Sequence, residues 1–100
     1  MEITEVNIYP FDTSGTGGRV RAVADIVIDE VLLIKGIKIV ENKHGGLFIV
    51  FPQKKTSTGN IIDIVQPLTK ELNDKIRRAV IDKYKEAFGM VLKEDLLGKD

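Results

Sequence analysis

Cysteine is absent from this sequence of 100 residues, and histidine occurs only once. The lack of cysteine excludes disulfide bonds and thiolate metal sites, and a single histidine leaves no familiar spacing of metal ligands. That histidine, His44, lies in a glycine-rich turn, where we expect a solvated side chain rather than a catalytic one. No pairing of a nucleophile with a base is visible. We therefore expect a protein that is not an enzyme and has no cofactor, metal or small-molecule substrate.

Long apolar runs are also missing. No run approaches the ~20 residues that a helix needs to cross a bilayer. No N-terminal segment combines the charged and apolar regions of a secretory signal. We expect a cytoplasmic protein with no membrane partner.

Acidic residues are absent from one long interval. The whole chain is neutral, with fifteen basic and fifteen acidic residues, whereas dedicated nucleic-acid binders are usually basic overall. Between Glu41 and Asp63, however, there is no acidic residue, and Lys43, Lys54 and Lys55 fall in this interval. The positive charge is therefore concentrated locally.

The remaining sequence has the patterns of strands and of one long helix. Apolar and β-branched residues, separated by turn residues, indicate strands at 3–9, 19–29, 31–41, 47–51 and 61–65. Residues 70–88 have helical spacing and end before Gly89. Strands followed by a helix predict an α+β fold, with an antiparallel meander of about five strands, one long helix and a short C-terminal tail or helix. We place a single domain at 1–89 and the tail at 90–100.

Several local features refine this prediction. Residues 20–28 alternate, which places one set of apolar side chains in a core. Asp29 and Glu30 form a plausible tight turn, and residues 12–18 form a loop. Gly36 interrupts the alternation of its strand and favours a β-bulge. Thr69, after Pro67, is a suitable helix cap.

The run 47–51 is apolar on both faces. Leu47, Ile49 and Phe51 would share one face, and Phe48 and Val50 the other. This pattern predicts a buried central strand, and one helix can cover only one side of its sheet. The second side needs another layer. A second copy of the chain is the favoured source, and residues 91–97 folding back are the alternative.

Two groups of polar residues could contact nucleic acid. The segment 53–60 reads as an exposed loop in which Lys54 and Lys55 precede the hydroxyls of Thr56, Ser57 and Thr58, and such groups suit phosphate oxygens. Paired lysines are also common on surfaces that bind nothing. The competing group lies along the helix edge and comprises Lys70, Asn73 and Arg77. On that helix Arg78 has acids four residues away on both sides, whereas Arg77 has no obvious partner.

At this point a family resemblance becomes visible. The sequence resembles the SpoVG family (stage V sporulation protein G) of bacteria over about residues 1–85. The most specific part is the lysine-rich loop after a Phe-Pro strand end, followed by an Asp-Ile strand and a proline before the helix. The matching segments are Glu2 to Asn7, Gly18-Arg19-Val20-Arg21-Ala22, Ile37-Lys38-Ile39-Val40, Gly46-Leu47-Phe48, Phe51-Pro52-Gln53-Lys54-Lys55-Thr56, Asp63-Ile64, Pro67, Lys75-Ile76, Ala79-Val80 and Tyr84.

The resemblance implies a small dimeric α+β protein that binds DNA and RNA and regulates gene expression. In spore-formers the family is also tied to septation and cortex formation. This chain departs from the family loop, Lys-Arg-Thr-Pro-Asp-Gly, by having Lys55, Ser57 and Thr58 in place of arginine, proline and aspartate. At the start of the helix, Asn73 replaces the family's arginine and Glu71 would repel phosphate. General binding therefore carries over better than any particular target sequence.

Two functions remain open from the sequence. The first is a homodimeric nucleic-acid-binding regulator with Lys54, Lys55, Thr56, Lys70, Asn73 and Arg77 as its contacts. The second is a dimeric protein–protein interaction module whose lysine loop is merely solvated.

Overall fold

The computed structural model describes residues 1–10 and 19–89 of the chain. The loop expected at 12–18 and the tail expected at 91–97 lie outside the described residues. The described part contains strands β1 (Ile3–Pro10), β2 (Val20–Ile28), β3 (Leu32–Glu41), β4 (Leu47–Val50), β5 (Gln53–Lys55) and β6 (Ile61–Asp63), helix α1 (Lys70–Tyr84) and a π-helical turn, Lys85–Gly89.

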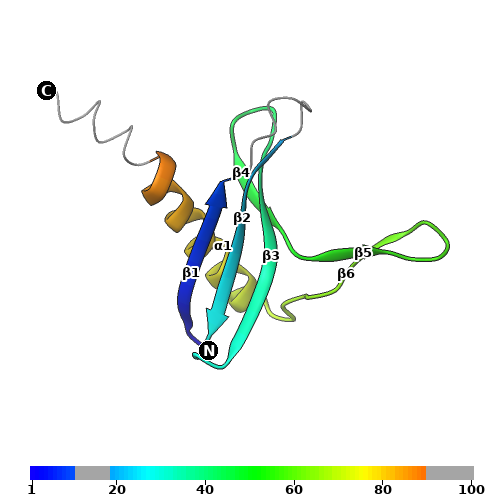
Figure 1. Ribbon diagram of the computed structural model, residues 1–100, viewed down its shortest axis with the longest axis horizontal. Coiled ribbons are helices and arrows are strands. Elements are labelled where there is room, and N and C mark those ends of the chain that lie inside the picture. The colour runs from blue at the N-terminus through cyan, green and yellow to red at the C-terminus, as the bar shows by residue number, and fades with distance from the viewer. Residues whose placement is uncertain (11–18, 90–100) are drawn as a thin grey trace, which may run out of the picture.

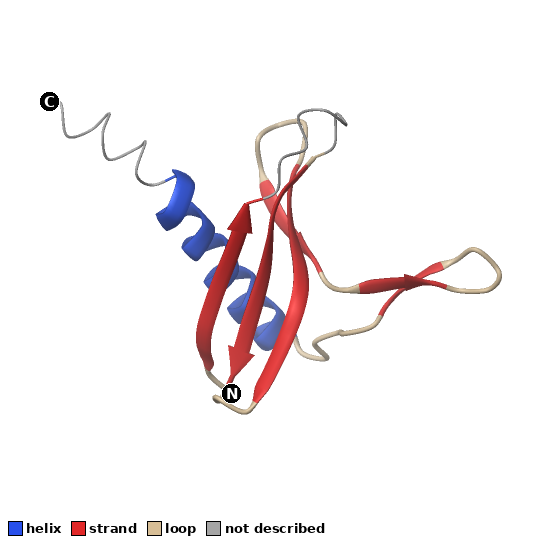
Figure 2. Ribbon diagram, viewed as in Figure 1, coloured by secondary structure: helices blue, strands red, loops and turns tan. Residues whose placement is uncertain are grey.

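The strands form two separate antiparallel sheets. Strands β1 to β4 make a four-stranded sheet in sequence order, and α1 lies across one of its faces (Figures 1 and 2). Strands β5 and β6 pair only with each other and form a hairpin that projects from this body. The α+β class, with an antiparallel meander followed by one long helix, is confirmed. The segment 53–55, expected within a loop, is instead a strand because it pairs with residues 61–63.

The core forms between the sheet and α1. Alternate residues of β2 are buried, from Ala22 and Ala24 at 0% exposed to Ile28 at 3%, so the alternation expected from the sequence is confirmed. Neighbouring β3 contributes Ile37 and Ile39, which are also fully buried. The helix closes this core with Ile76, Val80 and Ile81.

Gly36 forms the expected bulge in β3. Ala24 pairs with Ile37, but Ile26 pairs with Ile34, so Asp25 alone lies opposite two residues of β3. The bulge places Gly36 at a φ of 85°, a left-handed conformation that glycine adopts without steric cost. The Gly36 amide donates a hydrogen bond to Oδ1 of Asp25 at 3.2 Å.

The expected tight turn between β2 and β3 is also confirmed. Asp29 and Glu30 both have positive φ, 52° and 58°, and the Val31 amide donates to the Ile28 carbonyl at 2.9 Å. Two positive φ values are typical of the hairpin turn whose twist matches the strands. The start of β1 supports this turn, because Glu30 donates its amide proton to Oγ1 of Thr4 at 3.0 Å.

The prediction that strand 47–51 lies at the centre of the sheet is wrong for the single chain. Strand β4 is the edge of the sheet, because the chain leaves the body at Pro52 and the next strand pairs in the hairpin instead of beside β4. The assignment of its faces holds. Leu47, Ile49 and Phe51 pack against the core, whereas Phe48 on the other face is 41% exposed. Helix α1 thus covers one face, and we call the opposite side the open face of the sheet.

The helix begins and packs largely as expected. Oγ1 of Thr69 accepts a hydrogen bond from the Leu72 amide at 3.1 Å, which confirms the cap. Ile81 is buried beside Val80, on the face of the helix that packs against the sheet. The α-helix ends at Tyr84, and the predicted remainder is the π-helical turn.

Candidate nucleic-acid interface

The β5–β6 hairpin carries the two lysines on a paired strand rather than on a loose loop. Lys54 lies opposite Ile62, and Lys55 lies opposite Ile61. The base of the hairpin is tied twice: Nε2 of Gln53 donates to Oδ1 of Asp63 at 2.9 Å, and the Ile64 amide donates to the Pro52 carbonyl at 2.7 Å. The lysines are therefore held at defined positions.

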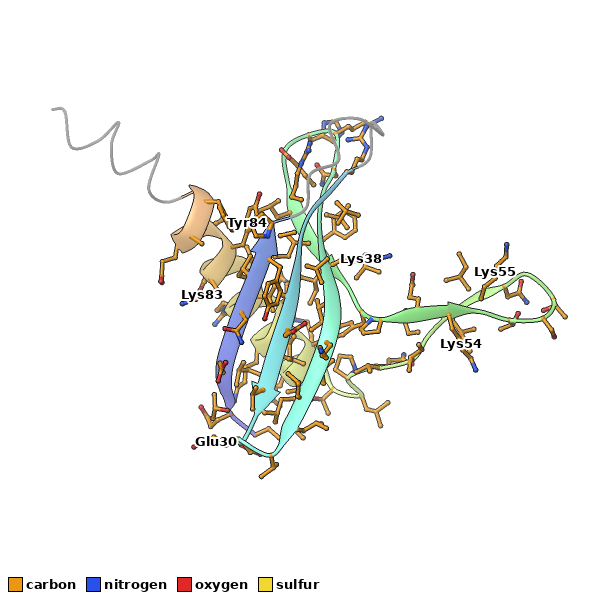
Figure 3. All side chains as sticks on the ribbon, in the orientation of Figure 1. Glu30, Lys38, Lys54, Lys55, Lys83 and Tyr84 are labelled. Carbon is orange, nitrogen blue, oxygen red and sulfur yellow. The ribbon has the colours of Figure 1, made fainter. Side chains whose placement is uncertain are left out.

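The two lysines lie on opposite sides of the hairpin. Consecutive residues of a strand point to opposite faces, and Figure 3 shows Lys55 above the hairpin and Lys54 below it. Both residues are exposed. One straight phosphate backbone can therefore contact only one lysine of a given hairpin, unless the nucleic acid wraps around the strand pair.

Two of the three hydroxyls near the lysines are used inside the turn. Oγ1 of Thr56 accepts a hydrogen bond from the Asn60 amide at 3.1 Å and lies 3.0 Å from Oγ1 of Thr58. The Gly59 amide donates to the Thr56 carbonyl at 3.0 Å, and Gly59 has a φ of 92°. Thr56 therefore shapes the turn, and its hydroxyl already has two hydrogen-bond partners there.

Lys38 is a cation of this region that the sequence interpretation did not select. Lys38 is exposed on the open face of the sheet. It lies opposite Val50, the last residue of β4 before the chain leaves the sheet. In Figure 3 Lys38 lies on the same side of the hairpin as Lys55, in the angle between hairpin and sheet. The nearness of Lys38 to the hairpin depends on the direction in which the hairpin leaves the sheet, which no local sequence pattern shows.

On α1, two of the candidate residues, Lys70 and Arg77, lie close to the same acidic side chain, that of Asp74. Nζ of Lys70 lies 2.7 Å from Oδ2 of Asp74, and a guanidinium nitrogen of Arg77 lies 3.8 Å from Oδ1 of the same residue. The hydrogen bond from Lys70 lowers the pKa of Asp74 below its usual range, and the charge of Arg77 adds to this effect. Arg77 thus has a partner, three residues away, that the sequence interpretation missed. Asn73 is exposed on the same helix.

The six sequence-selected residues therefore fall into two sets on different elements. Lys54, Lys55 and Thr56 belong to the hairpin, and Lys70, Asn73 and Arg77 belong to the first half of α1. Within residues 1–10 and 19–89, no group of three or more His, Cys, Asp or Glu side chains could hold a metal ion. His44 is exposed in the turn before β4. No helix in the described part is long and apolar enough to cross a membrane.

Comparison with known proteins identifies the family. The model of the SpoVG family matches residues 1–86. "Putative septation protein SpoVG" of Caldicellulosiruptor saccharolyticus is 36% identical over 84% of this chain and 91% of its own. Proteins of the same name from Acetivibrio thermocellus and Oceanobacillus iheyensis are 37% and 33% identical, over 84% and 87% of this chain and 85% and 86% of their own. With the fold, the lysine-bearing hairpin and this match in place, the chain belongs to the SpoVG family.

Proposed function

We propose that this protein is a dimeric, cytoplasmic regulator that binds the phosphate backbone of DNA or RNA through its β5–β6 hairpin. It has no catalytic activity and needs no metal or cofactor. The names of its relatives refer to septation, and we place the regulated process there, in septation or sporulation-type control of gene expression.

The single observation that carries this proposal is the charge of the hairpin. It projects from the body, and both of its lysines are exposed. The sequence from 42 to 62 contains no acid that could compensate them. Lysine contacts to phosphate supply affinity without reading bases, so the expected binding is general rather than sequence-specific.

The helix set supports the proposal more weakly. Asp74 already pairs with Lys70 and Arg77, so each phosphate contact there competes with an existing ion pair. Glu71 adds a further negative charge in the first turn. We therefore assign the main contact to the hairpin and a secondary one to Lys70, Asn73 and Arg77.

The open face of the sheet supports the proposal of a dimer. Helix α1 covers the opposite face, and apolar side chains such as Leu33, at 53% exposed, remain on the open one. A second copy can cover both open faces with one two-fold interface.

Exposed apolar residues of the hairpin favour the alternative, an interaction module for another protein. Ile61 on the hairpin is 66% exposed, and a binding surface for protein commonly contains such residues. In that case the lysines are only solvated.

The salt dependence of binding to random-sequence DNA and RNA separates the two functions. Each neutralised phosphate contributes about 0.9 to the slope of log affinity against log salt for duplex DNA. Four hairpin lysines in a dimer give a slope of about −3.6, or roughly 100-fold weaker binding between ~50 and ~200 mM salt. If one side of each hairpin engages, the slope is about −1.8. Absence of salt-sensitive binding to either nucleic acid would leave the interaction module as the function.

A further inference from the structure

A shallow groove lies between strand β1, at the edge of the sheet, and helix α1. Two hollows of about 560 and 550 Å³ form it, and both are lined by Ile3, Ala79 and Asp82, so they are continuous. In Figure 1, β1 is the edge of the sheet opposite the one past which the hairpin projects. The β1–α1 groove is therefore separate from the hairpin, and it lies on the helix side of the sheet rather than on the open face.

The backbone of β1 has unused bonding groups along this groove. Among the described strands, β1 pairs only with β2. In an antiparallel pair the N–H and C=O groups of every second residue point away from the partner strand. The register shift between Ile3 and Glu5, together with Pro10, limits the regular part of this edge to residues 5–9. At about 3.3 Å per residue, that length suits an extended segment of four or five residues.

The floor of the groove is apolar. Ile3 and Val6 of β1 and Ala79 of α1 line it, and all three are half-buried. Successive side chains of a strand point to opposite faces of the sheet. A segment laid along β1 would therefore place every second side chain over this floor, between the strand and the helix.

The rim of the groove carries an excess of negative charge. Its acids are Glu2, Glu5, Glu71, Asp74, Asp82 and Glu86, and its cations are Lys75, Arg78 and Lys83. Two of the cations already pair with acids of the groove, Lys75 with Glu2 at 3.5 Å and Lys83 with Glu86 at 3.6 Å. Within the described residues, Glu71 and Asp82 make no ion pair. The rim therefore favours a positively charged ligand.

The same charge argues against other occupants of the groove. Two copies of this chain joined at β1 would bring their acidic rims together. Residues 90–100 of the chain itself carry three acids and two lysines, so they have no positive charge to offer. A phosphate backbone would be repelled by the rim. The occupant that fits both the free strand edge and the charge is a basic segment of another protein.

We propose that the β1–α1 groove docks an extended, basic segment of another protein, which adds to the sheet as a strand beside β1. In such strand addition the backbone hydrogen bonds supply affinity and the alternate side chains supply specificity. Lysine or arginine at every second position would lay its methylene stem over the apolar floor and direct its charge to Glu71 and Asp82. This inference goes beyond the proposed function, because it needs neither the dimer nor nucleic-acid binding.

The probe for the groove is the fluorescently labelled peptide Lys-Val-Lys-Val-Lys-Val-Lys, whose anisotropy is titrated with the full chain. The same peptide with glutamate in place of lysine should not bind. Asp82→Lys turns attraction into repulsion between exposed charges and should weaken binding of the lysine peptide roughly fivefold. Glu30→Lys makes the same change of charge in the β2–β3 turn, outside the groove, and should weaken binding less than about twofold, because salt screens distant charges.

Two further peptides test strand addition, each N-methylated on one of the two alternate sets of backbone amides. At least one should bind about tenfold more weakly, since its amides can no longer donate to β1. The proposal is overturned if the lysine peptide shows no saturable binding, if the glutamate peptide binds as well, if Asp82→Lys and Glu30→Lys lose equally, or if both methylated peptides keep full affinity. None of these results bears on nucleic-acid binding, which the salt titration of the wild-type chain tests separately.

Discussion

In the body formed by β1–β4 and α1, buried side chains such as Ile26, Ile37 and Val80 have no exposed surface, whereas every residue of β5 and β6 is exposed. The body is stabilised mainly by apolar burial, which contributes about 25 cal/mol per Å². The hairpin is held by backbone pairing, by the Gln53–Asp63 hydrogen bond and by the Thr56 turn. Residues that set stability and residues that make contacts are thus separated within one chain, so mutations in the two regions should have different consequences.

The largest expected effect comes from the core. Ile26→Ala removes a fully buried side chain between sheet and helix and should lower the free energy of unfolding by about 2–5 kcal/mol. Chemical denaturation measures this change. Val31→Ala, at 84% exposed, is the matched control and should change stability by less than about 0.5 kcal/mol. Equal effects of the two substitutions would show that the body is not the centre of stability.

A smaller loss is expected at the bulge of β3. Gly36→Ala places a Cβ at a φ of 85°, and this left-handed conformation costs about 1–2 kcal/mol for a residue other than glycine. No atom lies within 4 Å of the added Cβ, so the loss should come from backbone strain alone. Gly36→Asn, which tolerates this region better, should lose less in the same denaturation experiment. Equal losses for both variants would contradict the strain argument.

The smallest expected change is a gain at the β2–β3 turn. Glu30 has a φ of 58°, so Glu30→Gly relieves strain and should raise stability by about 0.5–1 kcal/mol after the entropy of glycine is subtracted. Glu30→Ala keeps the Cβ and should give no gain. A thermal melt that ranks alanine at or above glycine would argue against the turn geometry. Nucleic-acid binding should be the same in all three proteins, because this turn belongs to the body.

Local patterns in the sequence predicted most of the body. The alternation along 20–28, the bulge at Gly36 and the cap at Thr69 each depend on a few neighbouring residues, and each is confirmed. The position of β4 was not predictable in this way. Residues 61–63 have the same strand pattern whether they pair with β4 or with 53–55, and only the tertiary arrangement decides between these partners.

The candidate site was predicted less completely for similar reasons. The side chains of Lys54 and Lys55 can be assigned to opposite faces only once residues 53–55 are known to form a strand. Lys38 was missed because its place beside the hairpin depends on how the hairpin leaves the sheet, which local sequence patterns do not show. The ion pair between Arg77 and Asp74 had a local signal, since residues three apart on a helix are neighbours, but the sequence interpretation had assigned Asp74 to Arg78.

The most direct test of hairpin binding is the salt slope of nucleic-acid binding. The slope of the double variant that carries both Lys54→Ala and Lys55→Ala is compared with that of Arg77→Ala. We expect the hairpin double variant to lose about 1.8 units of slope if one side of each hairpin engages and about 3.6 units if both sides do. It should weaken binding to all sequences about equally and unfold at the wild-type temperature, since exposed lysines contribute little to stability. Arg77→Ala should change the slope of the whole dimer by less than about one unit, because Arg77 already pairs with Asp74. A hairpin variant with the wild-type slope, beside an Arg77→Ala protein that has lost it, would contradict the account and move the interface to α1.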